Sequence, residues 1–167
     1  MKSVLRHVRA ISLLPGMVAI VLPAILVLVG GLRTGLGLSH PYSTLVAVLG
    51  ENMLLVGLTL LIATNVRFAA AGQTLAPWDE TTKIVMKGLY LHLRNPMILG
   101  VCLILLGEGL LFSWWILGEL VLFVAGQAIF IHFFEEPELA QKFGAPYEKY
   151  RHNVPAWLPR VTPWDGR

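Results

Sequence analysis

Two polar motifs at the ends of a long apolar stretch carry the side chains best suited to chemistry. The first is Arg94-Asn95-Pro96, and the second is the adjacent carboxylate pair Glu135-Glu136. Pro96 has no backbone N–H and is best tolerated in the first turn of a helix, so a helix is predicted to start there. If the apolar stretch folds as a hairpin of two helices, the carboxylates return to the arginine. This convergence defines our candidate site.

The side chains of this site allow more than one role. Arg94 has a planar guanidinium that suits a carboxylate or phosphate, and it equally suits a positive anchor at a membrane surface. Glu135 and Glu136 lie where an apolar run stops, so they need a cation or hydrogen-bond donors nearby. They could bind hydroxyl or ammonium groups, orient a nucleophile, or mark where the helix leaves the bilayer. The spacing leaves these alternatives open.

The composition is that of a membrane protein. Of the 167 residues, 56% are hydrophobic and 14% are charged, and the mean hydropathy is +0.68. These values are far too apolar for a soluble domain of this size. The basic residues are not grouped with aromatic residues, so we expect no nucleic-acid partner. The single cysteine, Cys102, cannot form an intrachain disulfide and is interpreted as a packing residue.

Four segments approach the roughly 20 apolar residues that a membrane-spanning helix needs. They cover approximately residues 11–32, 42–66, 96–112 and 114–134. The short turn Phe112-Ser113-Trp114-Trp115 forces the last two into an antiparallel hairpin. Beyond them, Leu139, Phe143 and Tyr147 recur at a spacing of four, which predicts an amphipathic helical segment. We predict an all-α membrane bundle of about four transmembrane helices with a C-terminal amphipathic cytoplasmic cap, in one domain over residues 1–167.

The basic residues predict the orientation of this bundle. Twelve of the thirteen lysines and arginines precede the first span, lie between the second and third, or follow the fourth, and Arg33 alone falls on the opposite side. Basic residues favour the cytoplasmic side of a membrane. We therefore expect both termini, the middle loop and the candidate site in the cytoplasm, with the plasma (inner) membrane favoured over an organelle membrane.

Other ionisable residues support weaker hypotheses. The histidines lack the spacings typical of metal sites, so we expect no metal. His132, near the cytoplasmic end of the last span, is a candidate base or a polar interface residue. Glu51, Glu108 and Glu119 lie in or near the spans, where a charge is costly. They could line a proton or cation path, or pack as protonated carboxyls, and they motivate an alternative function as a small proton-coupled transporter.

An ordered set of short motifs adds a resemblance to this reading. The motifs are Gly88-Leu89-Tyr90, Arg94-Asn95-Pro96-Met97, Gly100, Glu135-Glu136-Pro137, Phe143-Gly144, Tyr147, Tyr150, Val154-Pro155 and Leu158-Pro159. Together they resemble the isoprenylcysteine carboxyl methyltransferase and phospholipid methyltransferase superfamily, over roughly residues 71–160.

The resemblance implies an integral membrane methyltransferase that uses S-adenosyl-L-methionine, with a cofactor region over approximately residues 71–100 and 132–160. The cofactor contacts that it implies are Lys83, Ile84, Val85, Tyr90, Asn95, Pro96, Met97, Ile98 and Glu136. Glu135 would face the methyl acceptor, and Arg94 and His132 are the other catalytic candidates. A positively charged sulfonium agrees with the nearby carboxylates.

The chain departs from the carboxyl methyltransferase pattern at three positions. Asn95 stands where histidine is common, Ile98 where an aromatic residue is common, and Ile131 where an arginine associated with prenylcysteine binding is found. These departures argue against a prenylcysteine carboxylate as acceptor. We predict methyl transfer to a lipid-like or small apolar acceptor, through a carboxylate, thiol or amine, at the cytoplasmic membrane face. They also motivate a second alternative, a noncatalytic membrane scaffold.

Overall fold

The structure is a computed structural model that describes residues 16–70 and 87–166. Its regular elements, all helical, are a π-helical segment Met17–Val21, α2 (Leu22–Gly30), a 3-10 turn Thr34–Gly37, α3 (Tyr42–Ala70), a 3-10 turn Gly88–Leu91, α4 (Pro96–Leu111), α5 (Trp115–Phe130), a π-helical segment Ile131–Glu135, α6 (Glu136–Phe143) and α7 (Ala145–Asn153). The predicted all-α fold is confirmed.

Three helices of the described chain are long and apolar enough to cross a membrane, namely Met17–Gly37, Tyr42–Arg67 and Trp115–Phe143. Pro96–Leu111 is a shorter apolar helix. This set agrees with about four membrane helices, the third of them short. Many of their large apolar side chains face outward, as Leu28 does at 84% exposure. Such an outer surface suits lipid rather than water.

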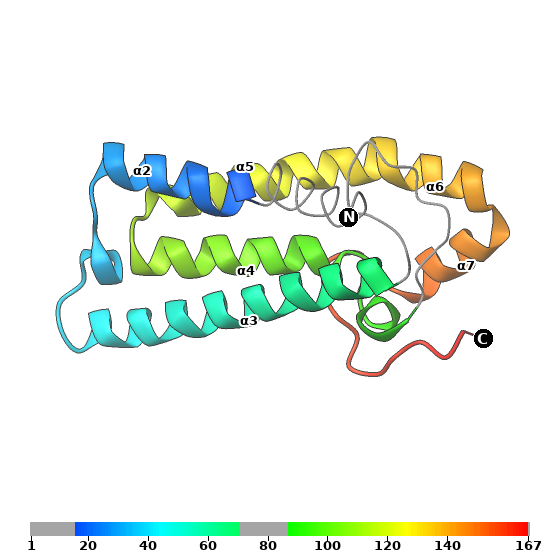
Figure 1. The fold of residues 1–167 in the computed structure, drawn as a ribbon, viewed down its shortest axis with the longest axis horizontal. Coiled ribbons are helices and arrows are strands. Elements are labelled where there is room, and N and C mark those ends of the chain that lie inside the picture. Colours follow the sequence, from blue (N-terminus) through cyan, green and yellow to red (C-terminus); the bar gives the residue numbers. More distant parts are fainter. Residues whose placement is uncertain (1–15, 71–86, 167) are drawn as a thin grey trace.

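The helices lie lengthwise beside one another (Figure 1). α3 and α4 run side by side in opposite directions, and α5 returns along the other side of α4. α5 continues through the segment Ile131–Glu135 into α6, while α7 folds back at one end of the bundle. The helix therefore does not end at the predicted span limit of residue 134. Pro137 lies at the start of α6, within the continuous helix.

Two pairs of glycines bring α3 and α4 into backbone contact. A Cβ atom placed on Gly57 would lie 2.7 Å from the carbonyl oxygen of Gly100, and one on Gly107 would lie 2.6 Å from that of Gly50. The glycines of each helix are seven residues apart, so both pairs lie along one seam. This seam holds α4 against α3 along most of its length.

The turn between α4 and α5 forms the hairpin that the sequence predicts. Gly109 packs against Leu117 across the hairpin. A buried cluster between the two helices contains Val101 and Leu105 of α4 and Ile116 of α5. The hairpin therefore returns the end of α5 to the level at which α4 begins.

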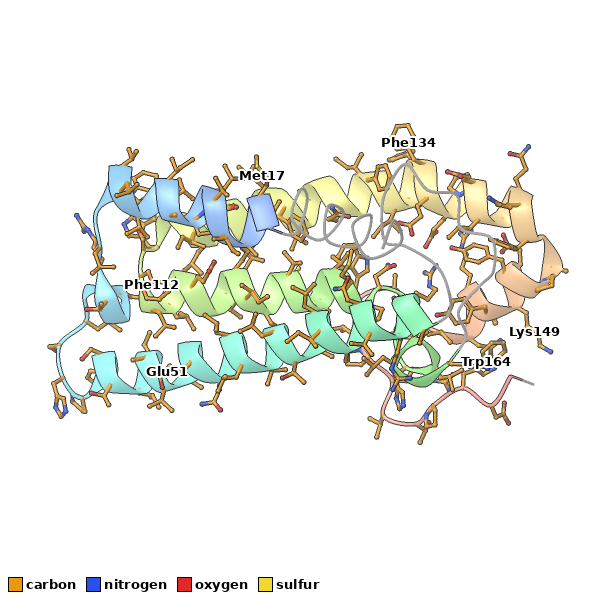
Figure 2. The ribbon with its side chains drawn as sticks, viewed as in Figure 1. Met17, Glu51, Phe112, Phe134, Lys149 and Trp164 are labelled. Atoms are coloured by element: carbon orange, nitrogen blue, oxygen red, sulfur yellow. The ribbon has the colours of Figure 1, made fainter. Side chains whose placement is uncertain are left out.

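The cap is a second, smaller core. Tyr147, Tyr150, Val154 and Trp164 are buried together, and Leu139, Ala140 and Phe143 of α6 pack against them. Gly144 joins α6 to α7 with a φ of 60°, a left-handed conformation that glycine adopts at little cost. The predicted amphipathic stripe is thus confirmed. Figure 2 shows Phe134 pointing away from the other helices, whereas Trp164 lies at the capped end.

Candidate functional site

An ion pair joins the two motifs of the candidate site. Nη1 of Arg94 donates to Oε1 of Glu136 at 2.6 Å, and the two side chains are only 12% and 10% exposed. Arg94 precedes α4, and Glu136 opens α6 at the end of the long returning helix. The predicted convergence of the arginine on the carboxylate pair is confirmed. A pair this shielded from water is screened far less than a surface salt bridge.

A second arginine holds the other oxygen of the same carboxylate. Nε of Arg151, on α7, lies 3.4 Å from Oε2 of Glu136, and its side chain is 40% exposed. Arg151 also lies 3.8 Å from the exposed Glu148. Sequence reasoning missed Arg151 as a site residue. The break at Gly144 is the sequence signal that could have indicated it, because α7 must fold back there onto α6.

Two buried tyrosines surround the arginine. Nη1 of Arg94 also donates to the hydroxyl of Tyr147 at 3.4 Å. The hydroxyl of Tyr150 donates to the carbonyl oxygen of Tyr90 at 2.7 Å. Burial raises the pKa of Tyr147, which the charge of Arg94 partly opposes, and burial also raises the pKa of Tyr150 and Tyr90. All three phenols are therefore neutral at physiological pH, and Tyr147 is a neutral acceptor.

The chain after α7 fixes the backbone around Arg94. The amide of Arg94 donates to the carbonyl oxygen of Pro155 at 2.9 Å, and the side-chain amide of Asn95 donates to that of Ala156 at 3.3 Å. Asn95 is the N-cap residue of α4 but makes no capping hydrogen bond with its side chain. Its amide instead ties α4 to the tail.

A second set of bonds extends this contact toward the 3-10 turn. The amide of Arg160 donates to the carbonyl oxygen of His92 at 2.9 Å, and that of Trp164 donates to the carbonyl oxygen of Leu91 at 2.9 Å. The Nδ1 atom of His92 lies 2.8 Å from the carbonyl oxygen of Arg160. Hydrogen bonds therefore join residues 91–95 to the C-terminal segment 155–164, and they fix the backbone of Arg94 in the absence of a ligand.

The remaining predicted cofactor residues divide into two groups. Pro96, Met97 and Ile98 form the first turn of α4, so the predicted helix start is confirmed, and Tyr90 is buried just before them. Lys83, Ile84 and Val85 lie outside the described residues. The structure thus brings Tyr90 and residues 94–98 to the end of the bundle that carries Glu136.

Glu135 and His132 differ from Glu136 in their surroundings. Both belong to the π-helical segment Ile131–Glu135, a local geometry that often occurs at functional sites. Glu135 is partly buried, and within residues 16–70 and 87–166 it forms no ion pair or hydrogen bond. His132 is exposed, with its ring 4.8 Å from that of Phe133. Among the described residues, the arginines thus pair with Glu136 and not with Glu135, and His132 forms no hydrogen bond with Arg94.

The fold and the site together identify the class of protein. The chain is a helical membrane protein with a buried, arginine-bound carboxylate where two apolar helices meet. A model of the phospholipid methyltransferase family matches residues 45–146, more than half of the chain. The chain therefore belongs to this family of methyltransferases, as the motifs predict. The match includes Arg94 and Glu136, whereas Arg151 lies beyond it. No curated protein and no solved structure matches the chain.

Proposed function

We propose that this protein transfers a methyl group from S-adenosyl-L-methionine to a lipid-like or small apolar acceptor at the cytoplasmic face of a membrane, the plasma (inner) membrane in preference to an organelle membrane. The observation that carries the proposal is the 2.6 Å ion pair between Arg94 and Glu136. It joins two motifs that both lie inside the family match. The distribution of basic residues supports a proposed orientation with both termini in the cytoplasm.

The free hydrogen-bonding groups of the site fit this methyl donor. Nε of Arg94 is buried and has no acceptor in the part of the chain that the structure describes. A buried donor left unpaired costs about 1–3 kcal/mol, so a ligand that brings an acceptor oxygen is favoured. The amino-acid carboxylate of S-adenosylmethionine is such a group. Glu135, which forms no ion pair with a described residue, suits the positive sulfonium.

The surroundings of each residue suggest its role in the proposed reaction. S-adenosylmethionine supplies an electrophilic methyl group when it is bound. Glu136, held by two arginines, keeps Arg94 in place and is itself a positioning residue more than a direct contact. Glu135 faces the acceptor. An amine acceptor must lose a proton, which a carboxylate oxygen of Glu135, or the imidazole of His132, would accept. A thiolate or carboxylate acceptor needs no such base.

The walls of the proposed cofactor site come from both sides of Arg94. Tyr90 and the first turn of α4 supply one wall. The segment that contains Lys83, Ile84 and Val85 is proposed as a second source of contacts, from the resemblance alone. Most of the rate gain in a displacement comes from aligning the reactants and excluding water. The hydrogen-bonded C-terminal segment would contribute by holding the residues that line the cofactor site in fixed positions.

The substitution Glu135→Gln tests the catalytic part of this proposal. With an amine acceptor we expect turnover of labelled S-adenosylmethionine to fall at least about 100-fold, since general-base catalysis contributes about 10²–10⁴. Glu138→Gln, an exposed neighbour in α6, is the matched control. Unchanged turnover in Glu135→Gln with intact cofactor binding would remove the base role.

The two alternative functions predict different outcomes. A proton-coupled transporter would depend on Glu51, Glu108 and Glu119 and would not need Asn95 or Glu136. A noncatalytic scaffold would keep its fold but fail to bind S-adenosylmethionine. A single comparison of cofactor binding and proton-driven uptake in these variants therefore separates the three.

A further inference from the structure

An open cavity of about 420 Å³ lies at the end of the bundle opposite Arg94. Apolar side chains line it, among them Val27 and Leu28 of α2, Phe112 and Ile116. Glu108, in the last turns of α4, is the one charged residue among the described residues that line it. The volume falls within the range of small-molecule sites. A lone carboxyl among apolar walls needs an explanation.

Several polar side-chain oxygens of the α4–α5 hairpin lack hydrogen-bond partners among the described residues. Within the described chain, Oε2 of Glu108, both carboxyl oxygens of Glu119 and the hydroxyl oxygen of Ser113 are buried without a hydrogen bond. All of them belong to the hairpin of α4 and α5. Three of the four are carboxyl oxygens, and none of them is paired with an arginine or lysine side chain within residues 16–70 and 87–166. Among the described residues, the cavity lining therefore supplies these oxygens with neither a side-chain N–H donor nor a cation.

Glu108 lines the cavity, and Glu119 is close in sequence to a residue that does. Glu108 is four residues before Phe112, the C-cap of α4, and Glu119 is three residues after Ile116 on α5. Phe112 and Ile116 both line the cavity. Leu117 packs against Gly109, so the two helices touch at this level.

We propose that this cavity binds a small single-chain amine, with its ammonium group at Glu108 and its alkyl tail along α2. An ammonium carries three N–H donors and a positive charge, which are what the unpaired oxygens lack. An anion would be repelled, and an alcohol would bring one donor and no charge. A hard metal ion requires six or more oxygen ligands, and the lining offers one carboxyl.

This site is separate from the proposed methyl-transfer site. Glu108 is twelve positions beyond Pro96 along α4, a rise of about 18 Å. Nothing in the amine site depends on Arg94 or Glu136. Binding there should leave the affinity for S-adenosylmethionine unchanged, which makes the failure of one proposal distinguishable from the failure of the other.

Titration of octylammonium chloride into the full chain in a neutral detergent, followed by calorimetry, tests the proposal. We expect saturable binding, weakened at least about tenfold by Glu108→Gln because a buried charge partner is lost. Glu51→Gln is the matched control, since Glu51 is an exposed glutamate on α3 outside the cavity (Figure 2). 1-Octanol, with the same tail, should bind wild type and Glu108→Gln equally weakly.

A second variant keeps the test decisive if Glu108→Gln does not fold. Ala24→Leu adds bulk to an exposed residue of the lining and changes no charge, so it should also weaken octylammonium binding. Octylammonium binding that survives in both variants would overturn the proposal. So would equal affinity of the wild type for octanol and octylammonium, or the absence of saturable binding.

Discussion

The two ends of the helix bundle treat buried carboxylates in opposite ways. At the capped end, Glu136 is 7% exposed, and each of its oxygens faces an arginine. At the other end, Glu108 and Glu119 keep buried oxygens without hydrogen-bond partners among the described residues. The protein itself compensates the charge of a paired carboxylate, whereas an unpaired one raises the free energy of the folded state until a ligand binds.

This difference indicates where each end is ready for ligands. At the capped end the protein supplies its own counter-charges and a hydrogen-bonded C-terminal segment, so within the described residues the unpaired groups include only Nε of Arg94 and the carboxyl of Glu135. At the far end a ligand must supply both charge and donors.

Glu136→Ala should have the largest effect, because it leaves two arginines facing a gap. Breaking a buried ion pair by removing one partner costs about 3–5 kcal/mol. We expect a lower free energy of unfolding by chemical denaturation and loss of S-adenosylmethionine binding. Glu148→Gln, which alters only an exposed contact of Arg151 at 3.8 Å, should change stability little. Similar stability of wild type and Glu136→Ala would mean that the ion pair does not stabilise the fold.

Gly57→Ala should have the second-largest effect on stability, because the added methyl group pushes apart α3 and α4, which connect the two ends of the bundle. The added Cβ would lie 2.7 Å from the carbonyl oxygen of Gly100, and overpacking of this kind costs about 1–3 kcal/mol. Gly118→Ala is the control, since no atom lies within 4 Å of a Cβ there. Thermal unfolding in detergent should rank Gly57→Ala below Gly118→Ala, and the reverse order would contradict the seam.

Glu108→Leu should change stability in the opposite direction to Glu136→Ala. Replacing an unpaired carboxyl with an apolar side chain removes a desolvation cost, so we expect a gain of about 1 kcal/mol. Chemical denaturation of the two variants under the same conditions gives both free energies of unfolding. A loss of stability in Glu108→Leu as large as that in Glu136→Ala would show that the far end is not short of partners.

Tyr150→Phe should have the smallest effect at neutral pH, about 1 kcal/mol for one lost hydrogen bond. Burial raises the pKa of Tyr150, so the unfolded chain ionises first. The resulting stability is present below about pH 10 and is lost as pH rises through the raised pKa of the folded state. The variant should therefore lose less stability than wild type in alkaline denaturation, and equal loss would count against the buried phenol.

The sequence predicts the features that depend on local rules. Pro96 specifies a helix start, and the short turn between the last two apolar segments specifies a hairpin. Those two facts suffice to bring Arg94 to Glu136. The family motifs then identify the same residues independently, and the family match agrees with them.

Features that depend on folding back in three dimensions are not predictable in this way. Arg151 reaches Glu136 only because Gly144 takes a φ of 60° and reverses the chain. The contact of Asn95 with Ala156 joins positions with no local relation. From the sequence alone, Glu51 and Glu108 are both glutamates in or near apolar spans. The structure distinguishes them, because Glu51 is exposed on α3 whereas Glu108 lines the cavity.

The most direct test of the account is calorimetric titration of S-adenosylmethionine into the detergent-purified protein. We predict saturable binding by wild type and by Glu51→Ala, and its loss in Glu136→Ala and Asn95→Ala, with circular dichroism confirming that each variant is folded. Absence of binding by folded wild type, or unchanged affinity in a folded Glu136→Ala, would contradict the proposal that the capped end is a methyl-donor site.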